Sequence, residues 1–274
     1  MAIRNIMVHL DLGPRTEKRL GLAVSLARKH GARLVGVFGQ LADAQRVGVV
    51  AAWPPEEYRE AAEASRKLFD AGVAGLPRVD WVDANRGSES EVIRVVTMYA
   101  RHADLVVMGQ HDERGRPAEP ADLVHDVIMQ SGRPVLVVPY IGDFDVVGRS
   151  PLIAWSDTRE AARALMDSLE VIAGCRDAHV VSMGAKREEA EEACAQAAAH
   201  LALHGIDAKV EAFVLVDNEG VGVMDMLLNR VTDRTADLLV MGAHGGGSNL
   251  PFASKGSGTR HILRHMTVPV LMSN

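Results

Sequence analysis

Hydrophobic residues in this chain gather in short apolar runs, and longer segments with helical periodicity lie between the runs. In the first half the runs predict five strands and the intervening segments predict four helices. The predicted strands are Asn5–Asp11, Arg33–Gly39, Asp80–Ala84, Asp104–Gly109 and Pro134–Pro139. The predicted helices are Arg15–His30, Glu56–Val73, Glu89–His102 and Leu123–Gln130.

The second half repeats this alternation. Its predicted strands are Leu152–Trp155, Ala178–Met183, Lys209–Val216, Asp237–Gly242 and Pro269–Met272. Its predicted helices are Arg159–Ile172, Arg187–Leu203, Gly222–Asp233 and Thr259–Met266. Strands that alternate with helices favour an α/β fold in which helices cover both faces of a parallel sheet.

The two halves are also similar in amino-acid sequence. Asp104–His111 reads DLVVMGQH and Asp237–His244 reads DLLVMGAH, so six of eight positions are identical. Each segment is followed by a Pro-Val-Leu strand, within Arg133–Pro139 and Val268–Asn274. An internal repeat of this length predicts two domains, residues 1–140 and 151–274, joined by a linker at Tyr140–Ser150.

The composition argues against several functions and locations for this protein. The net charge of −6 argues against binding to nucleic acid, because a polyanion needs a basic surface. Two cysteines, Cys175 and Cys194, form no disulfide framework and no four-ligand zinc site. The N-terminal segment becomes polar by Asp11, and no apolar run is long enough to cross a membrane. We therefore expect a cytoplasmic protein without a membrane partner.

The segment Met241–Thr259 is the strongest candidate for a binding site. It leaves a buried strand, contains six glycines and leads into a helix, with Lys255, Ser257 and Thr259 as donors near the helix start. A glycine loop before a helix N-terminus favours anion binding, and open α/β folds bind ligands at the carboxyl ends of their strands. The alternative is a flexible connection, since glycine clustering alone is weak evidence.

Three other motifs do not fit this segment. Lys255-Gly256-Ser257 has the wrong order for a P-loop, and the segment follows the fourth strand of its half, whereas a dinucleotide fingerprint follows the first. Gly256-Ser257-Gly258 lacks the spacing of a nucleophile elbow. Ser257 is therefore interpreted as a phosphate or capping hydroxyl, and we predict no catalytic residue.

With these motifs, the chain resembles a tandem universal stress protein. Gly242 and Gly245 match the first glycine pair of that family, and Gly256-Ser257 match its later Gly-Ser/Thr pair after ten residues, one more than usual. His261–Ser273 continues the family's ending. The resemblance implies two tandem open parallel five-stranded sheets of the adenine-nucleotide α-hydrolase-like, Rossmann type.

The resemblance also implies a ligand, ATP or a related adenine nucleotide, with or without Mg²⁺. In the second half, Ser156 stands where the family has an acidic residue, Asp157 lies beside it, and Met183 is the second-strand residue at the adenine. The candidate binding residues of the second half are Gly242, His244, Gly245, Gly246, Lys255, Gly256, Ser257, Thr259, Ser156, Asp157 and Met183.

The first half departs from the family in the opposite way. Asp11 occupies the acidic position, but the loop after Gly109 has lost the second glycine and carries Asp112 and Glu119. Carboxylates in this loop would repel phosphates. We expect this half to be a structural partner, with the two halves pairing through their last strands as an intramolecular pseudo-dimer that could dimerise further.

Three functions remain open from the sequence: a stress-response protein that binds nucleotide, a slow ATPase or nucleotidyl-transfer enzyme, and an interaction module without ligand. The first is favoured, because no base, carboxylate pair or synthetase motif indicates catalysis.

His244, His261 and His265 could in principle hold a metal, but we predict no metal site. The two cysteines are interpreted as idle thiols.

Overall fold

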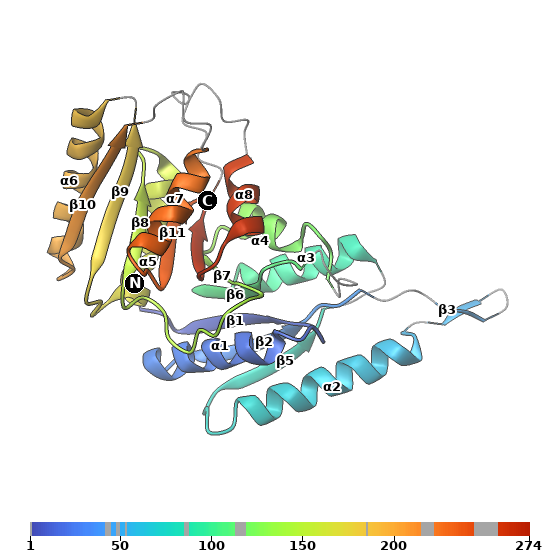
Figure 1. Ribbon diagram of the computed structural model, residues 1–274. Coiled ribbons are helices and arrows are strands. Elements are labelled where there is room, and N and C mark those ends of the chain that lie inside the picture. The colour runs from blue at the N-terminus through green and yellow to red at the C-terminus, as the bar shows by residue number, and fades with distance from the viewer. Residues whose placement is uncertain are drawn as a thin grey trace. The chain divides into compact units, whose positions relative to one another are not determined.

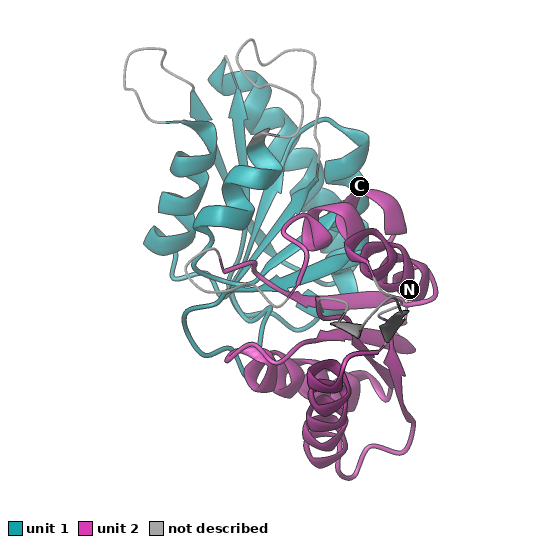
Figure 2. Cartoon of the chain, turned by 90° about the vertical axis from the view of Figure 1, so that its right-hand side faces the viewer, with its two compact units in different colours: residues 1, 134–274 teal, residues 2–133 magenta. Residues whose placement is uncertain are grey.

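The computed structural model describes residues 2–41, 45–47, 50–52, 54–84, 88–112, 119–184, 186–214, 222–243 and 257–274. The chain forms two compact units, which Figure 2 draws in magenta and teal. We call residues 2–133 the N-unit and residues 134–274 the C-unit. Each unit is an α/β domain with its own apolar core.

In the described part of the N-unit, parallel strands lie in the order β6-β1-β2-β5. These strands are β1 (Asn5–Leu10), β2 (Arg33–Phe38), β5 (Val79–Asp83) and β6 (Leu105–Gly109). The helices are α1 (Thr16–His30), α2 (Glu56–Gly72), α3 (Glu89–Ala100) and α4 (Leu123–Ser131). Helix α1 packs against α2, and α3 packs against α4, on opposite faces of the strands (Figure 1). Coverage on both faces explains why β1 and β6 are almost continuously apolar.

The described strands of the C-unit lie in the order β10-β9-β8-β11-β12-β7. They are β7 (Val135–Val138), β8 (Pro151–Trp155), β9 (Ala178–Gly184), β10 (Ala208–Val214), β11 (Leu238–Gly242) and β12 (Val270–Ser273). The helices are α5 (Arg159–Ile172), α6 (Arg187–Leu203), α7 (Val223–Asp233) and α8 (Ser257–His265). All strand pairs are parallel except β12 with β7.

Strand β7 has the partner that the sequence predicts. Val135 and Val137 pair with Met272 and Val270 in an antiparallel ladder, and both strands are fully buried. The expected contact between Pro134–Pro139 and Pro269–Met272 is therefore confirmed. Because β7 forms backbone hydrogen bonds with β12 in this ladder, β7 is grouped with the C-unit. The boundary between the compact units therefore lies between residues 133 and 134. The sequence had placed this strand as the fifth in the first domain.

This pairing predicts the behaviour of fragments. Residues 146–274 keep the contacts by which the Asp237 carboxylate accepts hydrogen bonds from the backbone N–H groups of Gly148, Arg149 and Ser150, but they lack β7. This fragment exposes the edge of β12 and is expected to self-associate. Residues 134–274 carry their own β7, which covers the edge of β12, so this fragment is expected to self-associate less than residues 146–274. Light scattering on both fragments checks this, and a monomeric 146–274 fragment would contradict it.

The helix and strand prediction is confirmed for each predicted element to within about two residues at most ends, the usual uncertainty of element boundaries. One described feature was missed, a hairpin of β3 (Gln45–Val47) and β4 (Val50–Ala52). Strands of three residues are too short to give a periodic signal. Within the described residues, no helix combines the length and apolar character needed to cross a bilayer.

Candidate functional site

The carboxyl ends of β8, β9 and β11 meet at one edge of the C-unit sheet. Trp155 pairs with Ser182, and Ala154 pairs with Met241. The next residues along these three strands are Ser156, Met183 and Gly242, so the parallel register brings these sequence-predicted positions together. This is the edge at which open α/β sheets bind ligands.

The side chains at this edge are accessible. Ser156 and Asp157 are exposed, and Met183 is half-buried. Ser156 lies beside the start of α5, where its hydroxyl is 3.3 Å from the hydroxyl of Thr158. Thr158 caps α5 by accepting a hydrogen bond from the Ala161 N–H at 3.2 Å. Ser156 thus supports a helix cap and still faces solvent.

The glycine loop itself lies mostly outside the described residues. His244, Gly245, Gly246, Lys255 and Gly256 belong to the part that the structure does not describe. Helix α8 begins at Ser257, as the anion-site interpretation requires, and Thr259 in its first turn is buried. The described ends of the loop, Gly242 and Ser257, are therefore a strand end and a helix start.

Gly242 has a packing role that the sequence did not suggest. A Cβ atom at this position would lie 2.6 Å from the backbone N of Ala161 and 2.6 Å from the carbonyl carbon of Glu160. The first turn of α5 therefore approaches the end of β11 so closely that only glycine fits. This contact is with the chain's own helix, so Gly242 by itself does not indicate a ligand.

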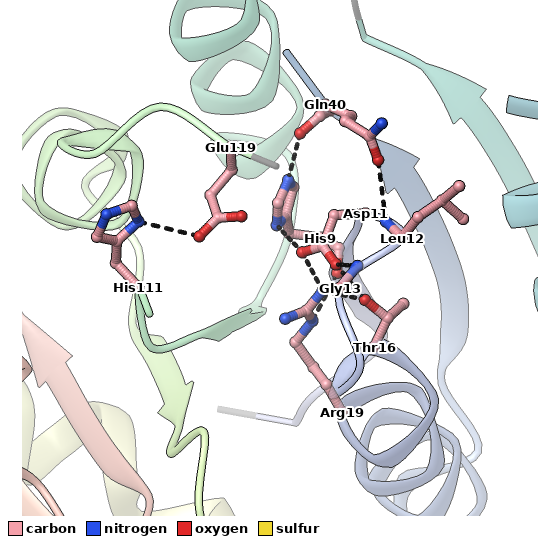
Figure 3. A network of polar contacts seen from close by, with 10 residues as sticks. His9, Asp11, Leu12, Gly13, Thr16, Arg19, Gln40, His111 and Glu119 are labelled. Carbon is pink, nitrogen blue, oxygen red and sulfur yellow. Dashed lines mark hydrogen bonds and ion pairs between the residues drawn. The ribbon is translucent and has the colours of Figure 1, made fainter. Parts of the chain in front are cut away.

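The equivalent edge of the N-unit holds a buried polar network (Figure 3). The Asp11 carboxylate forms an ion pair with Arg19 at 2.7 Å, and both side chains are about 5% exposed. The carboxylate also accepts hydrogen bonds from the Gly13 N–H at 2.6 Å and from the Thr16 hydroxyl. Arg19 donates a second hydrogen bond to the carbonyl of His9 at 2.8 Å.

The two ends of the network, His9 and Arg19, each contact the backbone at the end of a neighbouring strand. His9 Nε2 donates to the carbonyl of Gly39 at 2.9 Å, at the end of β2. Arg19 lies over Gly109 at the end of β6, where a Cβ would come within 2.0 Å of Nη1. Gly109 is therefore needed to admit a guanidinium group, whereas its repeat counterpart Gly242 is needed to admit a helix.

The electrostatics of this network keep Asp11 ionised and His9 neutral. Burial opposes the charge on Asp11, but the Arg19 guanidinium and the Thr16 hydroxyl hold the pKa of this carboxyl well below its usual range. Burial lowers the pKa of His9, with Arg19 adding to the shift, although the Asp11 carboxylate acts against it. The pair of Asp11 and Arg19 therefore forms an internally compensated ion pair.

The strand registers allow the two edges to be compared position by position. Val8 pairs with Val107 in the N-unit, and Ile153 pairs with Val240 in the C-unit. Counting from these pairs, the N-unit residues His9, Asp11, Thr16 and Arg19 correspond to Ala154, Ser156, Ala161 and Ala164. None of these four described C-unit counterparts is ionisable, so they form no equivalent of the N-unit network.

Sequence reasoning singled out Asp11 but missed Arg19 and His9. The available signal was an arginine within the apolar stripe of α1, between Thr16 and Leu20, both of which are buried. A buried arginine requires an anionic partner. The partner could not be identified from spacing, because Asp11 lies in the turn before the helix.

The described part of the loop after β6 contains the acidic residues Asp112 and Glu119 that the sequence indicated. His111 pairs with Glu119 at 3.0 Å, and both side chains are largely buried. Glu119 thus adds an acidic group near the N-unit edge, where it also influences His9. Residues 113–118 of this loop lie outside the described part.

The remaining candidate groups have other contacts. His261 Nε2 is 2.7 Å from an Asp225 carboxylate oxygen, and the ring of His261 stacks on that of His265. Among the residues that the structure describes, no three His, Cys, Asp or Glu side chains are grouped as metal ligands. Cys194 is buried, and burial raises the pKa of its thiol to about 11. This thiol therefore stays protonated and unreactive at neutral pH.

Comparison with known proteins agrees with this architecture. Residues 159–274 match the model of the Universal stress protein family. The universal stress protein from Archaeoglobus fulgidus DSM 4304 is 15% identical, with a TM-score of 0.68 over 98% of both chains. None of the curated proteins compared with the chain matches it.

Two shorter solved structures align with about half of the chain. A universal stress protein in complex with cAMP is 14% identical and covers 52% of this chain and 100% of its own, with a TM-score of 0.36. The universal stress protein from Archaeoglobus fulgidus in complex with dAMP is 20% identical and covers 50% of this chain and 98% of its own, with a TM-score of 0.35.

These findings define the fold class of the chain and the family that its C-terminal domain matches. The open, mostly parallel α/β sheet of each unit is of the Rossmann type. The domain at residues 159–274 matches the universal stress protein family. The likeness of the whole chain to the Archaeoglobus fulgidus DSM 4304 protein shows that the N-unit shares the fold.

Proposed function

We propose that this universal stress protein binds ATP or a related adenine nucleotide at the carboxyl edge of the C-unit. The observation that carries the proposal is the contrast between the two edges. The N-unit edge is occupied by His9, Asp11 and Arg19, whose charges and hydrogen bonds are satisfied by one another and by the backbone. In the C-unit, the corresponding residues are small and uncharged, and the exposed side chains of Ser156 and Asp157 are available to a ligand.

Each described part of the C-unit edge has a role in this proposal. Met183 lies at the end of β9 and would contact the adenine. Ser156 and Asp157 follow β8 and would lie near the ribose. The start of α8, with Ser257 and Thr259, would face the phosphates, because a helix N-terminus carries partial positive charge.

The undescribed loop supplies the other expected contacts. Gly245, Gly246 and Gly256 would allow close backbone approach, while His244 and Lys255 would supply polar and cationic groups. Mg²⁺ could accompany the phosphates. The universal stress proteins solved with cAMP and dAMP make an adenine nucleotide the first ligand to test.

Within this proposal the N-unit is the structural partner. In the N-unit, Leu10 of β1 pairs with Phe38 of β2, and in the C-unit, Trp155 of β8 pairs with Ser182 of β9. The residues that follow Phe38 and Ser182 are Gly39 and Met183, so Gly39 corresponds in register to Met183. The Gly39 carbonyl is already bonded to His9 and is not free for an adenine. We propose that the halves form an intramolecular pseudo-dimer and that the protein acts in a cytoplasmic stress response, as the family suggests.

We expect binding without rapid turnover. Fast phosphoryl transfer needs charge stabilisation and a positioned nucleophile or base, and Asp157 is the described acidic group at the edge. Phosphate release under saturating ATP and Mg²⁺ should stay far below the ordinary enzyme range of roughly 1–1000 per second. A rate within that range, abolished by His244→Ala, would favour an enzyme instead.

The direct test of the proposal is calorimetric titration of the full chain with ATP, in the presence and absence of Mg²⁺. The expected result is one nucleotide per chain. Mass spectrometry of small molecules released from the purified protein adds an independent check on the ligand. Absence of binding to ATP, ADP, AMP and cAMP would support an interaction module without ligand.

A further inference from the structure

Three side chains with affinity for soft metals lie together on the surface of the C-unit, away from the strand ends. Met166 lies in the middle of α5, and His200 lies in the last turn of α6. His200 Nε2 is 3.1 Å from the sulfur of Met166. The ring of His204 meets that of His200 edge-on, with 4.9 Å between the ring centroids.

We propose that Met166, His200 and His204 form a binding site for a soft monovalent cation of the Cu(I) class. A thioether sulfur and neutral imidazole nitrogens are the ligand types that Cu(I) prefers, whereas a thioether is a poor ligand for harder cations. His200 and His204 are four residues apart, so they share one face of the helix end. Met166 reaches the same place from the neighbouring helix.

The surroundings are consistent with a cation. His204 is the C-cap residue of α6, where the helix end carries partial negative charge. The ligands are also accessible, because Met166 is 47% exposed and His204 is exposed. A metal ion can therefore enter without any movement of the core.

Binding requires no redox step. The cation accepts lone pairs from the Met166 sulfur and from one unprotonated nitrogen of each imidazole. The alternative is an N–H···S hydrogen bond from His200 to Met166, which is weak because a thioether is a poor acceptor. The two interpretations differ in whether a soft cation changes the environment of the Met166 methyl group.

The sequence alone gave no indication of this site. The spacing of His200 and His204 is visible in the sequence, but Met166 is 34 residues away from His200. The contact arises because α5 and α6 bring the two side chains together. This site is independent of the nucleotide proposal, since none of its three residues lies at the carboxyl ends of β8, β9 or β11.

The experiment uses the full chain with Cys175→Ser, which removes the more accessible thiol as a competing ligand. Ag(I) serves as a redox-stable probe in chloride-free buffer, followed by calorimetry and by NMR of ¹³C-labelled methionine methyl groups. We expect one tight site, a large shift of the Met166 methyl signal, and at least tenfold weaker binding in Met166→Leu and in His200→Asn.

Matched controls are Met98→Leu, which changes another exposed methionine, and His261→Asn, which changes a histidine of the same helical spacing on α8. Both controls are expected to bind Ag(I) as the parent does. Binding that is unchanged in Met166→Leu, or weakened equally in Met98→Leu, would overturn the site. Circular dichroism checks that the variants are folded.

Discussion

Replacing Arg19 with alanine is expected to lower the free energy of unfolding by about 3–5 kcal/mol, the usual cost of leaving one member of a buried ion pair alone. Asp11 would keep its bonds to Gly13 and Thr16 but would lose its compensating charge. Urea denaturation followed by circular dichroism measures the change. A loss below about 1 kcal/mol would show that the network contributes no more than a surface pair.

The control is Arg66→Ala. Arg66 pairs with Asp70 at 2.9 Å, but both side chains are more than half exposed. Exposed pairs of this kind contribute at most about 1 kcal/mol. The comparison therefore separates the effect of burial from the effect of removing an arginine.

The pH dependence of the parent gives a second check on the same network. The pKa of Asp11 in the folded protein lies below its unfolded value of about 4. Its contribution is therefore fully present above about pH 4 and is lost as the pH falls through the folded pKa. The pKa of His9 is also lowered, so stability should already decline below about pH 6.5, where unfolded His9 takes up a proton.

The regular elements could be predicted because burial imposes a period on the sequence. The VLVV run of β7 and the apolar stripe of α1 are direct consequences of packing. The pairing of β7 with β12 followed from the repeat and the family resemblance. The assignment of β7 to the C-unit could not be predicted, because an apolar run does not specify which sheet it joins.

The candidate site was only partly predictable. The parallel register brings Ser156, Met183 and Gly242 to one edge, as the strand assignment implied. The network of His9 and Arg19 was missed, because a tertiary ion pair leaves no regular spacing. Asp11 illustrates the consequence: the sequence placed it as a family acid, whereas the structure shows a carboxylate committed to the protein's own arginine.

Because Asp11 is paired with Arg19, the variant Asp11→Ala is unsuitable for comparing nucleotide binding at the two edges. Asp11→Ala would leave Arg19 buried without its partner, so lost binding in that variant would report unfolding. A better control adds a negative charge at a harmless position. Gly21 in α1 is exposed, and a Cβ there would meet no atom within 4 Å.

Calorimetric titration of ATP into Gly245→Asp, compared with Gly21→Asp and the parent, tests the proposed nucleotide site most directly. Gly245 belongs to the loop outside the described residues, and an aspartate there would place a side chain and a negative charge near the phosphates. We expect binding to weaken at least tenfold, which is about 1.4 kcal/mol, while Gly21→Asp binds as the parent does. Equal affinity of all three proteins would contradict a nucleotide site at the C-unit edge.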